Sequence, residues 1–266
     1  MEQLTGVSET LLIPLYAKFL ETQREDGIIK DEKSSEIINQ LNLDLKKFSQ
    51  GFWSTQISCA VRTEILDQAV DEFLAKNPEA VVVNLGAGLC TRFSRLNNNV
   101  IRWFELDLPQ VKPVWEIVFE ETERHKFLAY SVLDFSWIKE IKPFVKSPIL
   151  FIAEGLLMYL SEEEVKRLFR EINQSFPQAE ILFEALSPII TSNSQRHAAV
   201  SKTDAVFQWG IQTGKELETW DKNIQFIQEW YYVDRHSSRW RWLQLFKYVP
   251  FLRKSMKIIR ISFRAA

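Results

Sequence analysis

A short apolar run that ends in two closely spaced glycines limits the folds open to this chain. Residues 80–85 are rich in valine, and Gly86, Ala87 and Gly88 follow directly. Such a run is typical of a strand buried on both faces of a parallel sheet. Glycines at its end let the backbone turn sharply and approach a ligand where a side chain would collide. The run therefore predicts the first strand of a ligand-binding α/β sheet.

An acid 21 residues after Gly86 strengthens this interpretation. Residues 101–106 indicate a second strand, and Asp107 follows it. An acid at this distance can accept hydrogen bonds from the hydroxyl groups of a ribose. Binders of nicotinamide dinucleotides and binders of S-adenosylmethionine both use this arrangement. A glycine turn without a ligand is a further alternative.

The glycine loop helps to separate the two cofactors. A dinucleotide fingerprint would have glycine at position 91, where this chain has Thr91. A cofactor without a pyrophosphate needs less of that phosphate cradle, so the loop favours S-adenosylmethionine. A phosphate-binding P-loop is excluded because no Gly-Lys-Ser/Thr follows, and no metal site is predicted.

Strand-like and helix-like segments alternate along the chain. Further strands are expected at residues 127–132, 149–153, 179–185, 224–233 and 257–263, and helices at 10–19, 58–73, 109–120, 161–175 and 238–248. The helix at 161–175 opens with a capping box, in which Ser161 is followed by Glu164. The alternation predicts a doubly wound, mostly parallel, seven-stranded α/β sheet of the Rossmann-like type, preceded by N-terminal helices.

No internal repeat or linker divides the 266 residues, so the sequence predicts a single domain. We expect an N-terminal helical segment over 1–79, a cofactor-binding core over 80–186 and final strands over 223–266. Residues 187–222 are polar and lack the strand that simple alternation would place there. They are interpreted as a helical cap inserted after the fifth strand.

Composition favours a soluble, cytoplasmic protein. The formal net charge of −2 provides no global field that would attract nucleic acid or a membrane. Cys59 and Cys90 are too few for a disulfide framework, which favours a reducing compartment. No signal peptide is evident, and no apolar stretch reaches the roughly 18 residues that span a bilayer. However, the chain has no acid after Asp234, so a nucleic-acid or membrane binder remains an alternative.

Polar residues also follow two later strands. Ser131 and Val132 end the third strand, where the adenine of a cofactor would lie; the nearby Asp134 alternatively caps a short helix that follows. Glu154 and Gly155 end the fourth strand, at the expected topological switch point of the sheet. The alternative for Glu154 is a structural role in binding backbone amides.

Three motifs in order resemble the leucine carboxyl methyltransferase superfamily, and within it the TcmP-like bacterial O-methyltransferases of polyketide metabolism. They are LGAGLCTR at 85–92, FELDLP at 104–109 and AEGLLMY at 153–159; SETLLIPLYA at 8–17 and VLDFSW at 132–137 also match. The resemblance covers nearly the whole chain. It implies the class I methyltransferase fold, S-adenosylmethionine as cofactor, and methyl transfer to oxygen on a small-molecule carboxylate or hydroxyl. It leaves the oligomeric state open.

The resemblance also implies roles for matching residues. Arg62 matches an arginine that pairs with the methionine carboxylate of the cofactor, which a guanidinium can grip with two hydrogen bonds. The alternative for Arg62 is a solvated helix arginine. The remaining implied contacts are Gly86, Ala87 and Gly88 at the methionine part, Asp107 and Leu108 at the ribose, Ser131 and Val132 at the adenine, and Glu154 and Gly155 near the amino-acid end. Lys18 aligns too loosely to be assigned.

One position departs from the family pattern, because relatives usually have aspartate where this chain has Cys90. This departure keeps open a catalytically silent protein that only binds the cofactor, beside an NAD-dependent oxidoreductase on the same fold. The catalytic residues stay unassigned, with Glu154 and Tyr159 as candidates to accept a proton. A carboxylate acceptor is already ionised and needs no base, which agrees with a chain that has only three histidines.

Overall fold

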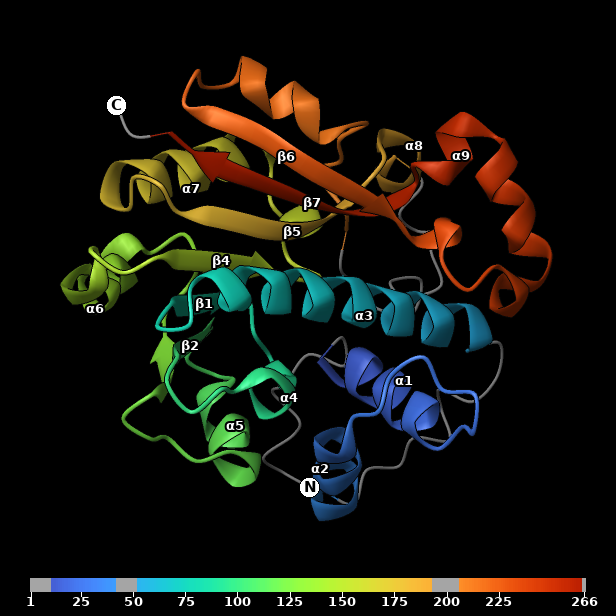
Figure 1. The fold of residues 1–266 in the computed structure, drawn as a ribbon, viewed down its shortest axis with the longest axis horizontal. Helices are drawn as coiled ribbons and strands as arrows, with labels where there is room; N and C mark the ends of the chain where they lie inside the picture. Colours follow the sequence, from blue (N-terminus) through green and yellow to red (C-terminus); the bar gives the residue numbers. More distant parts are fainter. Residues whose placement is uncertain (1–10, 42–51, 193–205, 265–266) are drawn as a thin grey trace.

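The computed structural model describes residues 11–41, 52–192 and 206–264, and its centre is a seven-stranded sheet (Figure 1). The strands are β1 (Val81–Leu85), β2 (Arg102–Asp107), β3 (His125–Ala129), β4 (Ile149–Ala153), β5 (Glu180–Leu186), β6 (Ile224–Tyr231) and β7 (Met256–Phe263), in the spatial order β3-β2-β1-β4-β5-β7-β6. The first five are parallel, and β7 runs antiparallel to both β5 and β6. The predicted doubly wound, mostly parallel sheet is confirmed.

Helices cover the two faces of this sheet because side chains alternate along each strand. In β1, Val82 packs in one apolar core with α3 (Trp53–Lys76), whereas Val81 and Val83 pack in the other with α7 (Glu162–Ser175). Figure 1 shows α3 lying across the face nearer the viewer. The capping box of Ser161 and Glu164 begins α7 as predicted.

Shorter elements fill the connections. The N-terminal helices α1 (Leu12–Thr22) and α2 (Glu32–Leu41) pack in a third core with α5 (Lys112–Val118). The others are α4 (Arg92–Leu96), η4 (Phe135–Trp137), α6 (Ile138–Ile141), η5 (Lys142–Phe144), η6 (Leu157–Tyr159), α8 (Pro188–Thr191), η8 (Gly214–Thr219), η9 (Tyr232–Asp234), η10 (Ser237–Tyr248) and α9 (Pro250–Arg253). None of the described helices is long and apolar enough to cross a bilayer.

The strand register determines what meets at the carboxyl edge of the sheet. Leu85 of β1 lies opposite Leu106 of β2 and Ala153 of β4, and Ala153 lies opposite Phe183 of β5. The next residue of each strand therefore falls in one row across four neighbouring strands. That row is Gly86, Asp107, Glu154 and Glu184.

The predicted helical cap over 187–222 is wrong for part of the described chain. Residues 206–213 form no helix, and residues 193–205 lie outside the described part. The amides of Gln208 and Ile211 donate to the carbonyls of Met158 and Leu186, so this backbone is paired with neighbouring segments instead of with itself. Regular structure in the segment is limited, among described residues, to the short α8 and η8.

Two other predicted elements also differ. The helix at 238–248 is a 3₁₀ helix, η10, which is interrupted at Arg241, where φ is 51° and ψ is −129°. A non-glycine residue in this region of backbone space cannot continue a helix. The third strand ends at Ala129 instead of 132, so Ser131 and Val132 lie in the turn that follows it.

The buried centre of the sheet predicts a large cost for shortening a core side chain. Leu182 of β5 is fully buried, whereas Ile227 of β6 is 40% exposed. We expect Leu182→Ala to lower the free energy of unfolding by about 2–5 kcal/mol, because it leaves a cavity that the packed core cannot fill. Urea denaturation followed by circular dichroism measures this. Ile227→Ala is the control, and equal losses in both variants would contradict the assigned core.

Candidate functional site

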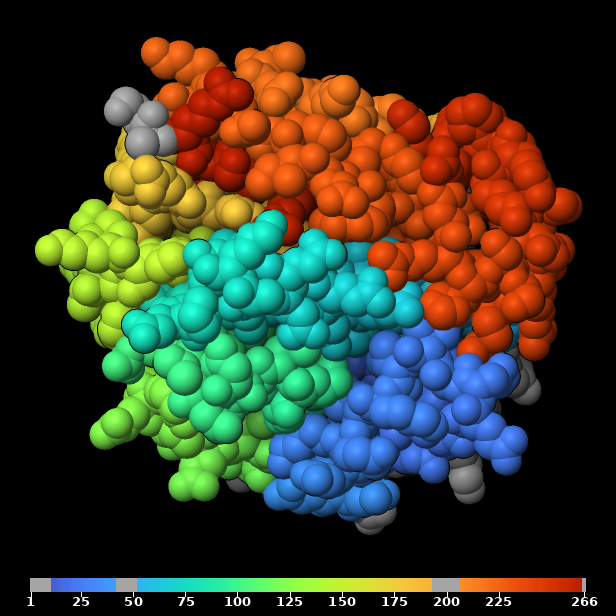
Figure 2. Space-filling model, viewed as in Figure 1, coloured from blue at the N-terminus to red at the C-terminus, as the bar shows by residue number. Residues whose placement is uncertain are grey.

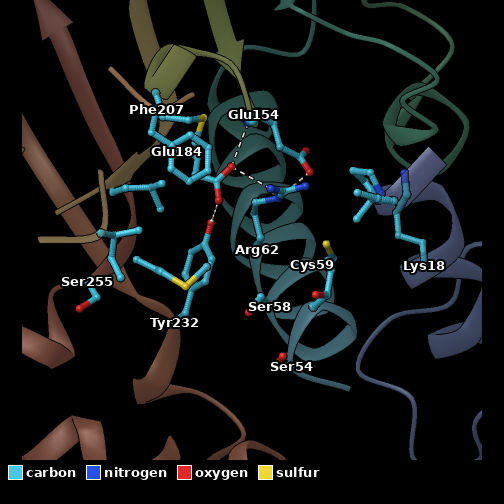
Figure 3. Close-up of a pocket in the computed structure, with 18 of the residues that line it drawn as sticks. Lys18, Ser54, Ser58, Cys59, Arg62, Glu154, Glu184, Phe207, Tyr232 and Ser255 are labelled. Atoms are coloured by element: carbon cyan, nitrogen blue, oxygen red, sulfur yellow. Dashed lines mark hydrogen bonds and ion pairs between the residues drawn. The ribbon is translucent and has the colours of Figure 1, made fainter. Parts of the chain in front are cut away.

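A cavity of about 530 Å³ opens at the carboxyl edge of the sheet, beside the row set by the register (Figure 3). One end is formed by the glycine loop after β1 and by the ends of β4 and β5. The other end is formed by the first turns of α3, which precede Arg62, and by the C-terminal segment around η10. Cavities at this edge are the usual ligand sites of doubly wound sheets.

Arg62 of α3 lies between two carboxylates at the inner end of this cavity (Figure 3). Its Nε is 2.8 Å from Oε1 of Glu154, and its Nη1 donates to Oε2 of Glu184 at 2.8 Å. The amide of Gly155 donates to the same Glu184 oxygen at 2.9 Å. No described residue hydrogen-bonds Nη2 of Arg62, so part of the guanidinium remains available to a ligand. The alternative of a solvated helix arginine is wrong, because the Arg62 side chain is only 11% exposed and forms ion pairs with both carboxylates.

The two arginines beside Glu154 determine its charge state. Burial disfavours the ionised carboxyl, but Arg62 and then Arg92 outweigh burial and hold the pKa of Glu154 well below its usual range. Arg92 Nη2 donates to Oε2 of Glu154 at 2.7 Å, and Arg92 Nε donates to Asp67 at the same distance. Glu154 therefore carries its negative charge throughout the neutral pH range.

A second group of charges extends this network away from the cavity. Arg95 Nε donates to Asp67 at 2.7 Å, and Arg95 Nη1 donates to Asp31 at 2.7 Å. Thr91 is buried and hydrogen-bonds Asp31, Arg95 and the Nζ of Lys18. Thr91, the residue that breaks the dinucleotide fingerprint, thus anchors the glycine loop to α1 and the chain that precedes α2. Lys18, which the sequence could not assign, belongs to this network and also lines the cavity.

Sequence reasoning missed Glu184, although it is central to the site. Its Oε1 accepts a hydrogen bond from the Tyr232 hydroxyl at 2.8 Å, while Oε2 binds Arg62 and Gly155. Burial, followed by the charge of Glu184, raises the pKa of Tyr232 well above its usual value, so the phenol stays neutral and donates. The acid inside the apolar sequence ILFEAL was the available sequence signal for this residue. That Glu184 lies beside Glu154 follows only from the strand register.

Asp107 fixes the shape of the glycine loop. Its Oδ2 accepts from the Gly88 amide and its Oδ1 from the Leu108 amide, both at 2.7 Å. Burial raises the pKa of Asp107 above its ordinary value, against the effect of these two bonds. Gly86 and Gly88 both have positive φ, and a Cβ on Gly88 would lie 2.6 Å from Leu11. Glycine is therefore required at this turn.

The structure brings together some of the predicted site residues. The cavity is lined by Arg62, Gly86, Ala87, Gly88, Glu154, Gly155 and Tyr159. Asp107 is connected to the cavity only by its hydrogen bond from the Gly88 amide. It is not among the lining residues, and neither are Leu108, Ser131 and Val132. Val132 packs into the core, and the Asp134 side chain accepts from the Ser136 amide at the start of η4. The capping alternative for Asp134 is confirmed.

Cys90 lines the cavity but is not placed as a nucleophile. Burial raises the pKa of its thiol, which keeps it protonated at neutral pH. Its Sγ accepts a hydrogen bond from Nη1 of Arg92 at 3.6 Å. His125 instead lies 3.4 Å from Glu105 within the sheet, and His197 lies outside the described residues. The thiol thus lies between the cavity and Arg92 and has no histidine beside it among the described residues.

Comparison with known proteins identifies the family. The model for leucine carboxyl methyltransferase matches residues 12–173, which is more than half of the chain. The chain belongs to this family. It is also 26% identical over 269 residues to the tetracenomycin polyketide synthesis O-methyltransferase TcmP of Streptomyces glaucescens, an alignment that covers 98% of both chains.

Solved structures support the same fold. A DUF574 family protein from Streptomyces avermitilis matches with a TM-score of 0.63 and 10% identity, covering 99% of this chain and 100% of that one. The magnesium protoporphyrin IX methyltransferase of Synechocystis with bound S-adenosylmethionine matches with a TM-score of 0.52 and 9% identity, covering 98% and 99%. The fold is that of the class I methyltransferases. The chain is a methyltransferase that uses S-adenosylmethionine, which replaces the NAD-dependent alternative.

The charge of Glu154 predicts a pH-dependent contribution to stability. A carboxyl whose pKa is lowered on folding stabilises the protein above its ordinary pKa of 4.5 and loses this contribution as the pH falls below that value. We expect Glu154→Gln to lower the free energy of unfolding by about 3–5 kcal/mol at pH 7, because two buried arginines lose a partner. The difference from wild type should shrink steadily below pH 4.5.

Urea denaturation across pH measures this difference. Glu79→Gln is the matched control because Glu79 is exposed, and its effect should stay within about 0.5 kcal/mol at each pH. A Glu154→Gln effect that is independent of pH would show that the lost stability does not come from the carboxylate charge.

Proposed function

We propose that this enzyme methylates an oxygen atom of a small, largely apolar molecule, and that a carboxylate is its preferred acceptor. The observation that carries this proposal is the asymmetry of the cavity. Its inner end is charged and lies at the glycine loop, while its outer end is apolar and lies against the C-terminal segment. One cavity thus offers adjoining places for a charged cofactor and an apolar acceptor.

The inner end suits the amino-acid part of S-adenosylmethionine. That group carries one carboxylate and one ammonium, and the site offers the guanidinium of Arg62 beside the carboxylates of Glu154 and Glu184. Gly86 and Gly88 keep the adjoining wall free of side chains. Asp107 retains acceptor positions for ribose hydroxyls on both carboxylate oxygens. Arg62, Glu154, Glu184 and Asp107 are therefore the residues that we assign to the cofactor.

The residues that the family pattern assigns to the adenine lie outside the cavity. Ser131 and Val132 lie in the turn after β3, and neither lines the cavity. Leu108 is exposed at the end of β2. An adenine bound beyond Asp107 would meet Leu108 and Ser131 outside the cavity, along the edge formed by β2 and β3, whereas the Val132 side chain belongs to the core. This placement rests on the family pattern.

The outer end offers an apolar acceptor two different walls. Ser54 and Ser58 precede Arg62 by eight and four residues on α3, so all three lie on one face of the helix and line the cavity. The remaining wall is formed by the apolar side chains of Met158, Phe207, Trp240, Leu243, Phe246 and Met256. This lining fits a molecule with an apolar body and one polar edge.

The lining of the cavity offers no strong base, which favours a methyl acceptor that is already ionised. Burial and then Glu184 raise the pKa of Tyr159 to about 12, so at neutral pH this phenol cannot accept a proton. Glu154 is held ionised by two arginines and is a weak base for the same reason. None of the described histidines lines the cavity. A carboxylate needs no base, whereas a phenol does.

Catalysis then depends mainly on position. S-adenosylmethionine supplies an electrophilic methyl group on its sulfonium when it is bound. The residues of this chain hold the acceptor oxygen in line with that methyl group and exclude water from the cavity. Orientation of this kind can contribute on the order of 7–11 kcal/mol to lowering a barrier.

Paired acceptors test the preference directly. The enzyme is incubated with S-adenosylmethionine and with aromatic carboxylic acids, and separately with the phenols of the same ring systems. We expect methyl esters from the acids at neutral pH, and phenol methylation that becomes appreciable only as the pH approaches the pKa of the phenol. Mass spectrometry and release of the ester methyl by mild base distinguish the products. Rapid methylation of phenols at neutral pH, with the acids inert, would overturn the carboxylate preference.

A further inference from the structure

Four large apolar side chains recur at every third position near the C-terminus and are exposed to solvent. Trp242, Leu245, Tyr248 and Phe251 are exposed by 63%, 61%, 72% and 49%. The first three belong to the 3₁₀ helix η10 after its interruption at Arg241. Residues three apart lie directly above one another in a 3₁₀ helix, so these side chains form one row. Phe251 continues the sequence pattern in α9. We call these four residues the outer row.

The other side of the same segment packs against the apolar core beneath α3, in which Trp240 is buried and which Leu243 and Phe246 contact. Leu243 and Phe246 line the apolar end of the cavity, as does Trp240, which is buried just before the interruption. The indole of Trp240 donates to the Arg235 carbonyl at 2.8 Å. The segment is therefore anchored through its inner side, and the exposure of the outer row is a property of a packed element. In Figure 2 this orange-red segment covers one end of the molecule.

The charge around the outer row is positive. Residues 235–264 contain no acid. Four arginines of this segment pair with acids, as Arg235 with Glu64, Arg239 with Glu21, Arg253 with Asp234 and Arg260 with Glu180. Among the other cations of this segment, Arg241, Lys247 and Lys254 lie near the row and have no carboxylate partner among the described residues. Arg241 stacks over Trp53, and Lys247 lies over Tyr248. Uncompensated positive charge thus flanks the apolar row.

We propose that the outer row docks this enzyme on an anionic lipid surface. Interfacial segments combine tryptophan, tyrosine and leucine on one side with lysine and arginine beside them, and the anionic headgroups attract the cations while the apolar groups enter the boundary of the acyl chains. An exposed row of this kind on a soluble protein marks an interaction site. A second copy of the chain fits less well, because a two-fold interface on this face would bring like charges together.

Docking in this orientation would place the apolar wall of the cavity next to the lipid. Leu243 and Phe246 line the cavity from the same helix that bears Leu245 and Tyr248 on its exposed side. An apolar acceptor dissolved in the bilayer would then have a short path to the cavity. This consequence rests on the proposed function, whereas docking itself does not.

Vesicle binding tests the proposal without cofactor or acceptor. The full chain is sedimented with vesicles of phosphatidylcholine alone and of phosphatidylcholine with phosphatidylserine, while tryptophan emission is recorded. We expect binding to the phosphatidylserine vesicles and a shift of the emission to shorter wavelengths. The double variant Trp242→Ser with Leu245→Ser should bind about tenfold more weakly or worse, because both side chains would leave water on docking. Lys247→Gln with Lys254→Gln should weaken binding most at low salt.

The matched control substitutes two exposed apolar residues elsewhere, Ile227→Ser with Val145→Ser, and should bind like wild type. Circular dichroism establishes that each variant is folded. The proposal would be overturned if the wild type bound neither kind of vesicle, or if the outer-row variant bound the phosphatidylserine vesicles as tightly as the wild type. A wild-type dimer in light scattering that becomes a monomer in the outer-row variant would also overturn it, because the row would then be an interface between copies.

Discussion

The buried guanidinium of Arg62 imposes strict requirements on everything around it. A charge in this position is tolerated only where opposite charges and hydrogen-bond partners surround it. Glu154 and Glu184 meet that requirement, and they meet it because the register of β4 and β5 brings the residues after Ala153 and Phe183 side by side. The register of the sheet thus determines the charge that surrounds Arg62. A shift of one residue in either strand would turn a carboxylate to the other face.

The same network connects the site to the N-terminal helices. Arg92 and Arg95 follow the glycine loop on α4 and share Asp67 of α3, while Thr91 and Asp31 bind Lys18 of α1. The cavity is therefore bounded by elements from both ends of the chain, because the opposite wall comes from η10 near the C-terminus. A charged half organised by ion pairs and an apolar half organised by packing give the cavity its two distinct ends.

Sequence patterns predicted the parts of this structure that depend on local chemistry. The valine run, the glycines and the capping box each specify a conformation that neighbouring residues impose, and all three were found. Glu184 was missed because its role arises from Arg62, Gly155 and Tyr232, which lie far from it in the sequence. Residues 206–213 were assigned wrongly because their conformation depends on partners distant in the sequence: the amides of Gln208 and Ile211 donate to the carbonyls of Met158 and Leu186. The break at Arg241 has no local sequence signal, since no glycine marks it.

The measurement that addresses the role of Arg62 most directly compares two ligands by calorimetry. S-adenosylmethionine and 5′-methylthioadenosine share the nucleoside, but the second lacks the amino-acid group. Binding of both is measured with the wild type and with Arg62→Lys, which keeps the charge but loses the fork of donors. If Arg62 binds the amino-acid end of the cofactor, the substitution lowers the affinity for S-adenosylmethionine by about tenfold or more and leaves the affinity for 5′-methylthioadenosine nearly unchanged. Equal weakening of both ligands, or no effect on either, would contradict the account.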